Sequence, residues 1–280
     1  MKVLVYQAYG RDDIKRQTLF SIVSLLSKTN FVAEAFQVWI YTEDEQFFTP
    51  YFANHPLVKC KLVAMEQIKK WRGAIDFVHR VKVEILIDAA AQFVGELYYC
   101  DGDTYFLSSP ASLFDQVNNN ISLMHIAENT LIDGRDPLSK KIKRFVKKNK
   151  FQVAGQNMQI PVETMMWNAG VLAVSQINKS LLPHVLELTD RLYSLYQKHI
   201  MEQLAFSVCL QNATKVLPSD GVVYHYWNQK DEYQILIDNY FATNKNLMTA
   251  IEQYQNISFP PAPKPKQRFL EKIYSKFLNK

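Results

Sequence analysis

Short apolar runs alternate with segments of helical periodicity along the first hundred residues. Four of the runs are rich in Val, Leu, Ile and Tyr and predict buried strands: 2–8, 36–42, 58–65 and 95–100. Segments 14–28 and 76–93 instead carry apolar residues at the spacing of a helix that is buried on one face. The resulting β-α-β-β-α-β order predicts an α/β fold with a mixed, mainly parallel sheet flanked by helices.

The second half of the chain follows a less regular pattern. Strands are expected at 121–127 and 167–175, and helices at 180–199 and 202–212. With 280 residues, 48% of them hydrophobic, the chain can form one large core. We therefore expect one folded domain rather than two.

Composition and termini restrict the cellular setting. Cys60, Cys100 and Cys209 are scattered among apolar residues, without the spacing of a metal site or a disulfide framework, and predict reduced thiols in a cytoplasmic protein. The N-terminal MKVLVYQAYG lacks the apolar region of a signal peptide and is interpreted as the first strand. No apolar stretch approaches the roughly 18 residues of a membrane span.

In the segment ELYYCDGDTYFL (96–107), an apolar strand is followed directly by two acids. Asp101 and Asp103 should repel each other and resist burial unless a cation lies between them. Mg²⁺ and Mn²⁺ suit this role, because they bind one or two protein carboxylates together with the phosphate oxygens of a substrate. Gly102 lets the backbone turn sharply and approach a ligand. The alternative is a surface turn with two solvated aspartates.

Other segments resemble those of GT-A glycosyltransferases, in particular the glycogenin-like and bacterial lipopolysaccharide galactosyltransferase-like enzymes. That family carries its Asp-x-Asp after a nucleotide-binding α/β half, as this chain does. MMWNAGVLAVS (165–175) resembles the family's Asn-Ala/Ser-Gly segment, HIMEQLAFSVCL (199–210) its acidic-Gln helix start, and VVYHYW (222–227) the region of its late histidine. The resemblance extends over residues 1–230, but NQKDEYQ replaces the family's Gly-x-Lys-Pro-Trp tail.

The resemblance implies a GT-A (Rossmann-like) fold and a metal-dependent sugar transfer. Residues 1–258 would form one catalytic domain, with a nucleotide-binding half at 1–107 and an acceptor half at 108–258. The donor would be a nucleoside-diphosphate sugar, with a UDP-sugar favoured, and the acceptor a glycan or a lipid-linked sugar in surface glycan or lipopolysaccharide synthesis. The resemblance also favours a retaining outcome.

The resemblance assigns the metal and the donor to residues of the first half and to the late histidine. Mn²⁺ or Mg²⁺ would be held by Asp101, Asp103 and His225, with Asp101 also near the ribose or a bridging water. The expected donor-binding residues are Tyr6, Gln7, Ala8, Arg80, Lys82, Asp101, Gly102, Asp103, Ala169, Gly170 and Trp227. Packing in the core and solvated helix charges are the alternatives for the aromatic and basic members of this set.

Catalysis is assigned to three residues of the second half. Asn168 offers an amide to sugar hydroxyls, and Gln203 is expected beside the anomeric centre, next to Glu202. The alternative is a simple turn at Asn168 and an ordinary first helical turn at Glu202, where an acid favours the helix dipole. An inverting enzyme would need a base, for which Glu163 and Glu202 are the candidates.

Two basic segments remain. SKKIKRFVKKNK (139–150) is typical of a solvated face or a mobile loop, and our hypothesis is that it contacts an anionic acceptor or a membrane surface. A Pro-rich linker and a basic amphipathic helix are expected at 259–280, where apolar and basic residues alternate as in helices that lie on anionic lipid. This helix would dock on its own domain or hold the protein at the inner face of the membrane. No nucleic-acid-binding motif accompanies the charge, and no nucleic-acid partner is expected.

Two other functions stay open. A nucleotidyltransferase that makes sugar nucleotides would share the nucleotide-binding half, but QAYGRDDIK (7–15) lacks the Gly-rich loop of those enzymes. A module that binds nucleotide-sugars without chemistry is the third interpretation, which intact acids and a late histidine disfavour.

Overall fold

The computed structural model describes residues 1–30, 32 and 35–261. The basic helix expected within 259–280, and most of the linker before it, therefore lie outside the described residues.

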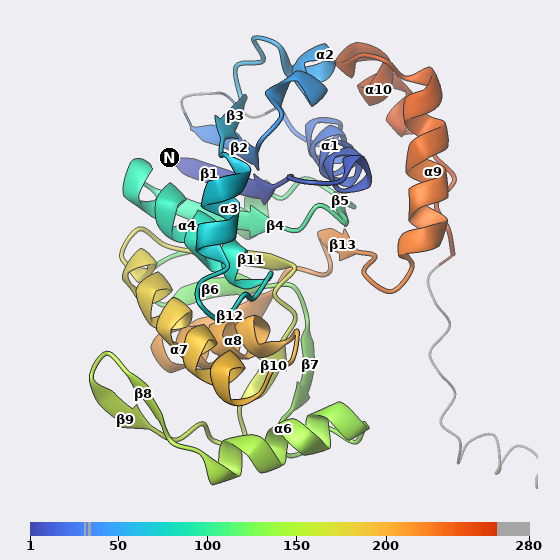
Figure 1. Cartoon of the computed structure of the whole chain (residues 1–280). Coiled ribbons are helices and arrows are strands. Elements are labelled where there is room, and N and C mark those ends of the chain that lie inside the picture. Colours follow the sequence, from blue (N-terminus) through green and yellow to red (C-terminus); the bar gives the residue numbers. More distant parts are fainter. Residues whose placement is uncertain (31, 33–34, 262–280) are drawn as a thin grey trace, which may run out of the picture.

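A mixed sheet forms the centre of the described chain (Figure 1). Its seven strands lie in the order β12-β6-β11-β4-β1-β2-β3. A parallel block is made of β1 (Lys2–Gln7), β2 (Phe36–Thr42), β3 (Val58–Leu62) and β4 (Glu96–Cys100). β11 (Val171–Val174) runs antiparallel to both of its neighbours, β4 and β6 (Ile121–Met124), and β12 (Lys215–Pro218) pairs parallel with β6. The predicted mixed, mainly parallel sheet is confirmed.

Helices cover both faces of the sheet, as Figure 1 shows. One core contains residues of α4 (Arg80–Gln92), α7 (Leu182–Leu195) and α8 (Met201–Ala213). The other contains residues of α1 (Asp12–Leu26), α9 (Lys230–Thr243) and α10 (Leu247–Tyr254). Because successive strand residues point to opposite faces, Val3 and Val5 of β1 join the first core while Leu4 and Tyr6 join the second.

Shorter elements complete the fold. Among the described residues, three antiparallel pairs lie outside the central sheet: β5 (Thr104–Phe106) with β13 (Val223–His225), β7 (Ala127–Thr130) with β10 (Met165–Trp167), and β8 (Phe151–Val153) with β9 (Gln156–Met158). The remaining α-helices of the described residues are α2 (Thr49–Phe52), α3 (Met65–Trp71), α5 (Ala111–Phe114) and α6 (Pro137–Lys148). Single 3₁₀ turns occur at Glu45–Phe47 and Asn178–Leu181.

Two strand pairings bring distant segments to the end of β4. The backbone N–H of Asp101 donates to the carbonyl of Gly170 at 2.8 Å, which extends the β4–β11 pairing by one residue. On the other side, Thr104 of β5 lies opposite His225 of β13, and the N–H of Tyr226 donates to the carbonyl of Asp103. The register of these two pairs therefore places the Asn168–Gly170 turn and His225 around the two acids.

Most of the expected elements are confirmed, with changed limits. The helix expected at 76–93 begins only at Arg80, because Asp76 adopts a left-handed backbone with φ of 48°. The strand expected at 58–65 ends at Leu62, and Met65 begins α3 instead. None of the helices in the described residues has both the length and the apolar character that crossing a membrane requires.

The basic segment 139–150 lies mostly within a helix, α6, and not in a mobile loop. Local contacts explain why α6 begins at Pro137. The Asp136 side chain accepts hydrogen bonds from the N–H groups of Leu138 and Ser139, and Pro137 occupies the first turn. Ile142 and Val146, four residues apart, are buried against the domain.

Candidate functional site

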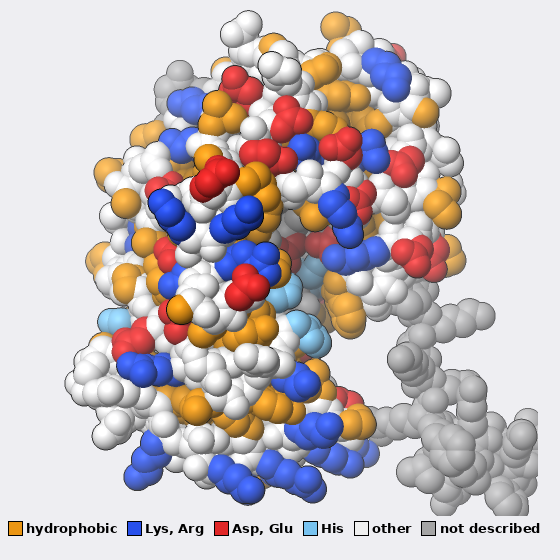
Figure 2. Space-filling model, in the orientation of Figure 1, with side chains coloured by type: hydrophobic (Ala, Val, Ile, Leu, Met, Phe, Trp, Pro, Cys, Tyr) orange, Lys and Arg blue, Asp and Glu red, His pale blue; other side chains and the backbone are white. Residues whose placement is uncertain are grey.

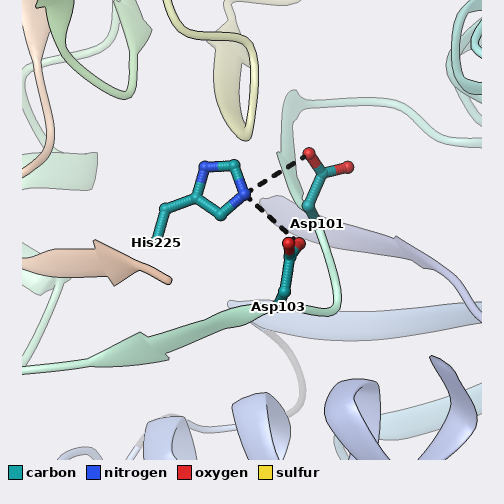
Figure 3. A group of neighbouring side chains, drawn as sticks. All are labelled: Asp101, Asp103 and His225. Atoms are coloured by element: carbon teal, nitrogen blue, oxygen red, sulfur yellow. Dashed lines mark ion pairs between the residues drawn. The ribbon is translucent and has the colours of Figure 1, made fainter. Parts of the chain in front are cut away.

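The two acids and the late histidine meet at the carboxyl end of β4 (Figure 3). His225 Nε2 lies 3.2 Å from Asp103 Oδ1 and 4.0 Å from Asp101 Oδ2. One ligand atom from each of the three side chains lies within 4.8 Å of the other two. Two carboxylate oxygens and one imidazole nitrogen form a donor set that fits Mn²⁺ and also accommodates Mg²⁺.

Asn168 sets the orientation and the tautomer of His225. The Asn168 Oδ1 atom accepts a hydrogen bond from the N–H of Gly170 at 2.9 Å, which identifies it as the oxygen of the amide. His225 Nδ1, 3.0 Å from the same oxygen, must then carry a proton and donate it. Because Nδ1 keeps its proton in this bond, Nε2 is the nitrogen that would ligate a metal, and it faces the two carboxylates.

Two glycines are required by close contacts in this site. A Cβ atom at Gly170 would lie 2.2 Å from His225 Nδ1, and a Cβ atom at Gly102 would lie 2.7 Å from Thr18 Oγ1 of α1. Only glycine lets the turn after residue 168 pack against the histidine and lets the turn between the acids pack against α1.

Asp103 is buried, with 6% of its surface exposed. Burial raises the pKa of its carboxyl, but the charges of His225 and Lys230 outweigh this effect and hold the pKa well below its usual value. Lys230 Nζ lies 2.8 Å from Asp103 Oδ2, while its side chain is 55% exposed. Asp103 thus stays ionised, next to a cation that can still reach solvent.

Lys82 lies beside Asp101 and is buried. Its buried ammonium lies 3.3 Å from Asp101 and 3.3 Å from Glu202, and it donates to the carbonyl of Ala169 at 3.0 Å. Burial lowers the pKa of Lys82, but the two acids outweigh burial and keep the lysine charged. Because one cation serves two acids, Glu202 is incompletely compensated, and burial raises its pKa to about 7.

The site opens into a cleft of about 620 Å³. Figure 2 shows the molecule hollowed in this region, with histidine and acidic side chains inside the hollow. The cleft is lined by Gln7, Tyr9, Ile14, Gln17, Val78, His79, Asp101, Gly102, Asp103, Glu128, Asp136, Leu138, Ser139, Asn168, His199, Ile200, Gln203, His225, Trp227 and Lys230. A larger groove of about 940 Å³ lies beside β3 and α4, but the metal-ligating group found among the described residues lies in the smaller cleft.

The expected site residues fall into three groups. Eight of them line the cleft: Gln7, Asp101, Gly102, Asp103, Asn168, Gln203, His225 and Trp227. Four others lie next to this group without lining the cleft: Lys82 contacts Asp101, Gly170 contacts Asn168, and Ala169 and Glu202 contact Lys82. Glu163 lies on an exposed loop outside the cleft lining.

Three expected donor-binding residues point elsewhere. The Tyr6 side chain is fully buried, and its hydroxyl pairs with Ser21, so it fills the core instead of facing a base. Ala8 is also fully buried. The Arg80 guanidinium is engaged by Asp190, Glu84 and the carbonyl of Trp71, and does not line the cleft.

The structure adds residues that the sequence did not reveal. Glu128 accepts hydrogen bonds from the amides of Asn168 and Gln203 inside the cleft, and burial raises the pKa of its carboxyl. It lies just beyond β6, which runs in the same direction as β4, so the carboxyl-end rule for parallel strands could have identified it. Lys230 lies in a segment with no family motif and gave no such signal.

Replacing Lys82 by Met should destabilise the protein by about 3 kcal/mol or more, because it leaves Asp101 and Glu202 buried without their shared cation. Urea denaturation in EDTA measures this loss. Adding Glu202→Gln should recover part of it. Lys230→Met is the control, since its ammonium is half-exposed and should contribute far less. Equal losses for the two lysine variants would contradict the role given to Lys82.

The stability of Glu202→Gln relative to wild type should rise with pH. The folded protein holds the Glu202 proton up to about pH 7, above the ordinary Glu value of 4.5, so wild-type stability falls as pH rises between these values. From about pH 5 to about pH 8 the relative gain should be on the order of 2 kcal/mol. Denaturation curves at each pH measure it, with Glu163→Gln as the exposed control. A difference that does not change with pH would refute the burial argument.

Comparison with known proteins identifies the fold. No protein-family model matches the sequence, and no curated protein matches it. Among solved structures, the galactosyltransferase LgtC in complex with donor and acceptor sugar analogs is 13% identical, with 78% of this chain and 73% of LgtC covered and a TM-score of 0.51. Apo mouse xyloside xylosyltransferase 1 is 12% identical, with 78% and 86% covered and a TM-score of 0.50. The chain therefore has the GT-A fold of these glycosyltransferases.

Proposed function

We propose that this protein is a metal-dependent glycosyltransferase that moves a sugar from a nucleoside-diphosphate sugar to an acceptor hydroxyl. The observation that supports it best is the convergence of Asp101 and Asp103 with His225, which lies more than a hundred residues later in the sequence, within one cleft. A surface turn with two solvated aspartates does not fit, because Asp103 is only 6% exposed. The GT-A fold is consistent with the proposal.

Asp101, Asp103 and His225 would hold the divalent cation, Mn²⁺ or Mg²⁺. When bound, the cation would neutralise the negative charge that develops on the diphosphate leaving group. Lys230 extends from the start of α9 beside Asp103, with an exposed ammonium that can contact the same diphosphate. The protein thus supplies positive charge next to the cation site in the segment that departs from the family motif.

The nucleotide would lie between Gln7 and Trp227. Gln7 lines the cleft, and its buried Oε1 has no hydrogen-bond partner within the described structure. This oxygen can therefore accept a hydrogen bond from an N–H group of a nucleobase such as uracil. Trp227 lines the same cleft with 53% of its surface exposed and can pack over the base or the ribose. A UDP-sugar is the donor that we favour.

The sugar would be bound by a network of Glu128, Asn168 and Gln203. Glu128 accepts from both amides, at 3.4 Å from Asn168 Nδ2 and 3.1 Å from Gln203 Nε2, and all three line the cleft. Such fixed polar groups can orient sugar hydroxyls and so align the anomeric carbon with the acceptor. We favour a retaining outcome by resemblance to the glycogenin-like and lipopolysaccharide galactosyltransferase-like enzymes, and neither Glu163 nor Glu202, the bases considered for an inverting reaction, lines the cleft.

We further propose that the reaction serves surface glycan or lipopolysaccharide synthesis in the cytoplasm, with a glycan or lipid-linked acceptor. The resemblance of residues 165–175 and 199–227 to those enzymes supports this setting. The LgtC structure, which holds donor and acceptor sugar analogs, is consistent with two sugars meeting in one cleft of this fold.

UDP should stabilise the protein against heat only when Mn²⁺ is present, because the diphosphate and the cation bind together. Thermal-shift measurements with UDP, GDP and CDP, each with and without Mn²⁺, test this expectation. Asp103→Asn should abolish the effect of the favoured nucleotide. Asp115→Asn is the matched control, since this exposed carboxylate lies outside the cleft lining.

Other outcomes would favour the competing functions. Stabilisation by a nucleoside triphosphate together with a sugar phosphate would indicate a nucleotidyltransferase. Stabilisation by a nucleotide-sugar without hydrolysis or transfer of any sugar in a donor panel would indicate a binding module. Metal-independent binding of UDP that survives Asp103→Asn would contradict the proposed site.

Asn168→Ala should weaken Mn²⁺ binding by about 10- to 100-fold, because His225 Nδ1 loses the acceptor that fixes its tautomer. Asn168→Asp keeps an acceptor for Nδ1–H and should retain more of the affinity. Isothermal titration calorimetry with Mn²⁺ compares the three proteins, and urea denaturation confirms that each is folded. Equal Mn²⁺ affinity in all three would show that Asn168 does not position the histidine.

A further inference from the structure

Helix α6 carries a basic stripe on its exposed face. Its sequence, PLSKKIKRFVKK, contains six Lys or Arg residues and no acid. The basic stripe consists of the exposed residues Lys140, Lys141, Arg144, Lys147 and Lys148. Their spacing of i, i+1, i+4, i+7 and i+8 places all five on one side of the helix. Figure 2 shows Lys and Arg side chains gathered along the lower edge of the molecule, where α6 lies in Figure 1.

The stripe is not used for internal ion pairs. Within the described residues, no carboxylate forms an ion pair with any of its five members. The acids nearest in sequence are already engaged, since Asp133 pairs with Thr130, and Asp136 caps the helix through Leu138 and Ser139. Lys143, on the flank of the stripe, donates to the carbonyl of Ile132. Five like charges held on one rigid helix repel each other and favour an anionic partner.

The opposite face of α6 decides what kind of partner fits. Ile142 and Val146 are buried in the domain core, and Leu138 and Phe145 pack against that core. The helix therefore has no free apolar face to insert into lipid, and contact through the stripe is purely electrostatic. Among its exposed residues there is no aromatic or amide side chain that could stack on or read nucleic-acid bases. A flat anionic surface matches a straight row of cations better than a nucleic acid does.

We propose that α6 docks the protein on an anionic phospholipid bilayer through the basic stripe. The same helix begins at the cleft, because Leu138 and Ser139 of its first turn are part of the cleft lining. Docking would thus hold the cleft next to the membrane surface. This part of the inference rests on the proposed glycosyltransferase function. A cleft held at the membrane favours an acceptor that is carried by a membrane lipid over a freely soluble glycan. An electrostatic contact of this kind is lost at high salt and is absent on neutral lipid.

Co-sedimentation of the full chain with lipid vesicles tests the proposal. Binding is expected to vesicles of phosphatidylcholine mixed with phosphatidylglycerol, and not to phosphatidylcholine alone. The variant Lys141→Gln/Arg144→Gln/Lys148→Gln should bind the anionic vesicles at least about tenfold more weakly, since each basic residue near the surface adds to the attraction. The matched control, Lys59→Gln/Lys69→Gln/Lys245→Gln, removes three exposed lysines elsewhere and should bind like wild type.

Each outcome decides the proposal. Full binding by the α6 variant would overturn it and assign any attachment to another segment, such as the basic C-terminal residues. Equal loss in both variants would show that only total charge matters, which also overturns it. Release of the protein from anionic vesicles by inorganic phosphate, but not by chloride at the same ionic strength, would indicate a site for free phosphate. That result would also overturn the proposal. Mn²⁺-dependent UDP binding, measured on the same variants, separates failure of this proposal from failure of the proposed function.

Discussion

The structure depends on compensating two neighbouring carboxylates at the end of a buried strand. Asp101 and Asp103 lie where β4 leaves the core, and burial disfavours the charge of Asp103. The protein compensates them with different groups, with Lys82 beside Asp101 and with His225 and Lys230 beside Asp103. Lys82 is sealed in the interior, whereas Lys230 is half-exposed. Both acids and His225 line the cleft, where an exchangeable cation can reach them.

The rest of the sheet positions this cluster. β11 pairs antiparallel with β4 and brings the turn of Asn168 and Gly170 against Asp101, while the β5–β13 pair brings His225 opposite Thr104. Asn168 then links the two, because one amide oxygen serves both the backbone of Gly170 and the ring of His225. An Asn that was expected to contact sugar thus fixes the orientation of His225, and its Nδ2 still faces Glu128.

Much of the fold and the centre of the site were predictable from local patterns. Buried strands such as β1 and β4 are nearly continuous apolar runs, and the acid pair follows one of them directly. The expected residues that do not line the cleft differ in a physical way. Tyr6 in β1 and Ala8 just after it flank Gln7, but of these three only Gln7 lines the cleft, and the direction of a side chain near a strand end depends on register. Arg80 was expected to contact the diphosphate, but its guanidinium is bound by Glu84 of α4 and Asp190 of α7.

The central claim is that Asp101, Asp103 and His225 together hold a divalent cation that carries a diphosphate. Crystals grown with Mn²⁺ and UDP, measured at the manganese absorption edge, test it most directly. We expect one strong anomalous peak within coordination distance of His225 Nε2 and of both carboxylates, continuous with density for the UDP phosphates. Nucleotide bound in the cleft with no manganese at these three side chains, or manganese bound elsewhere, would contradict it.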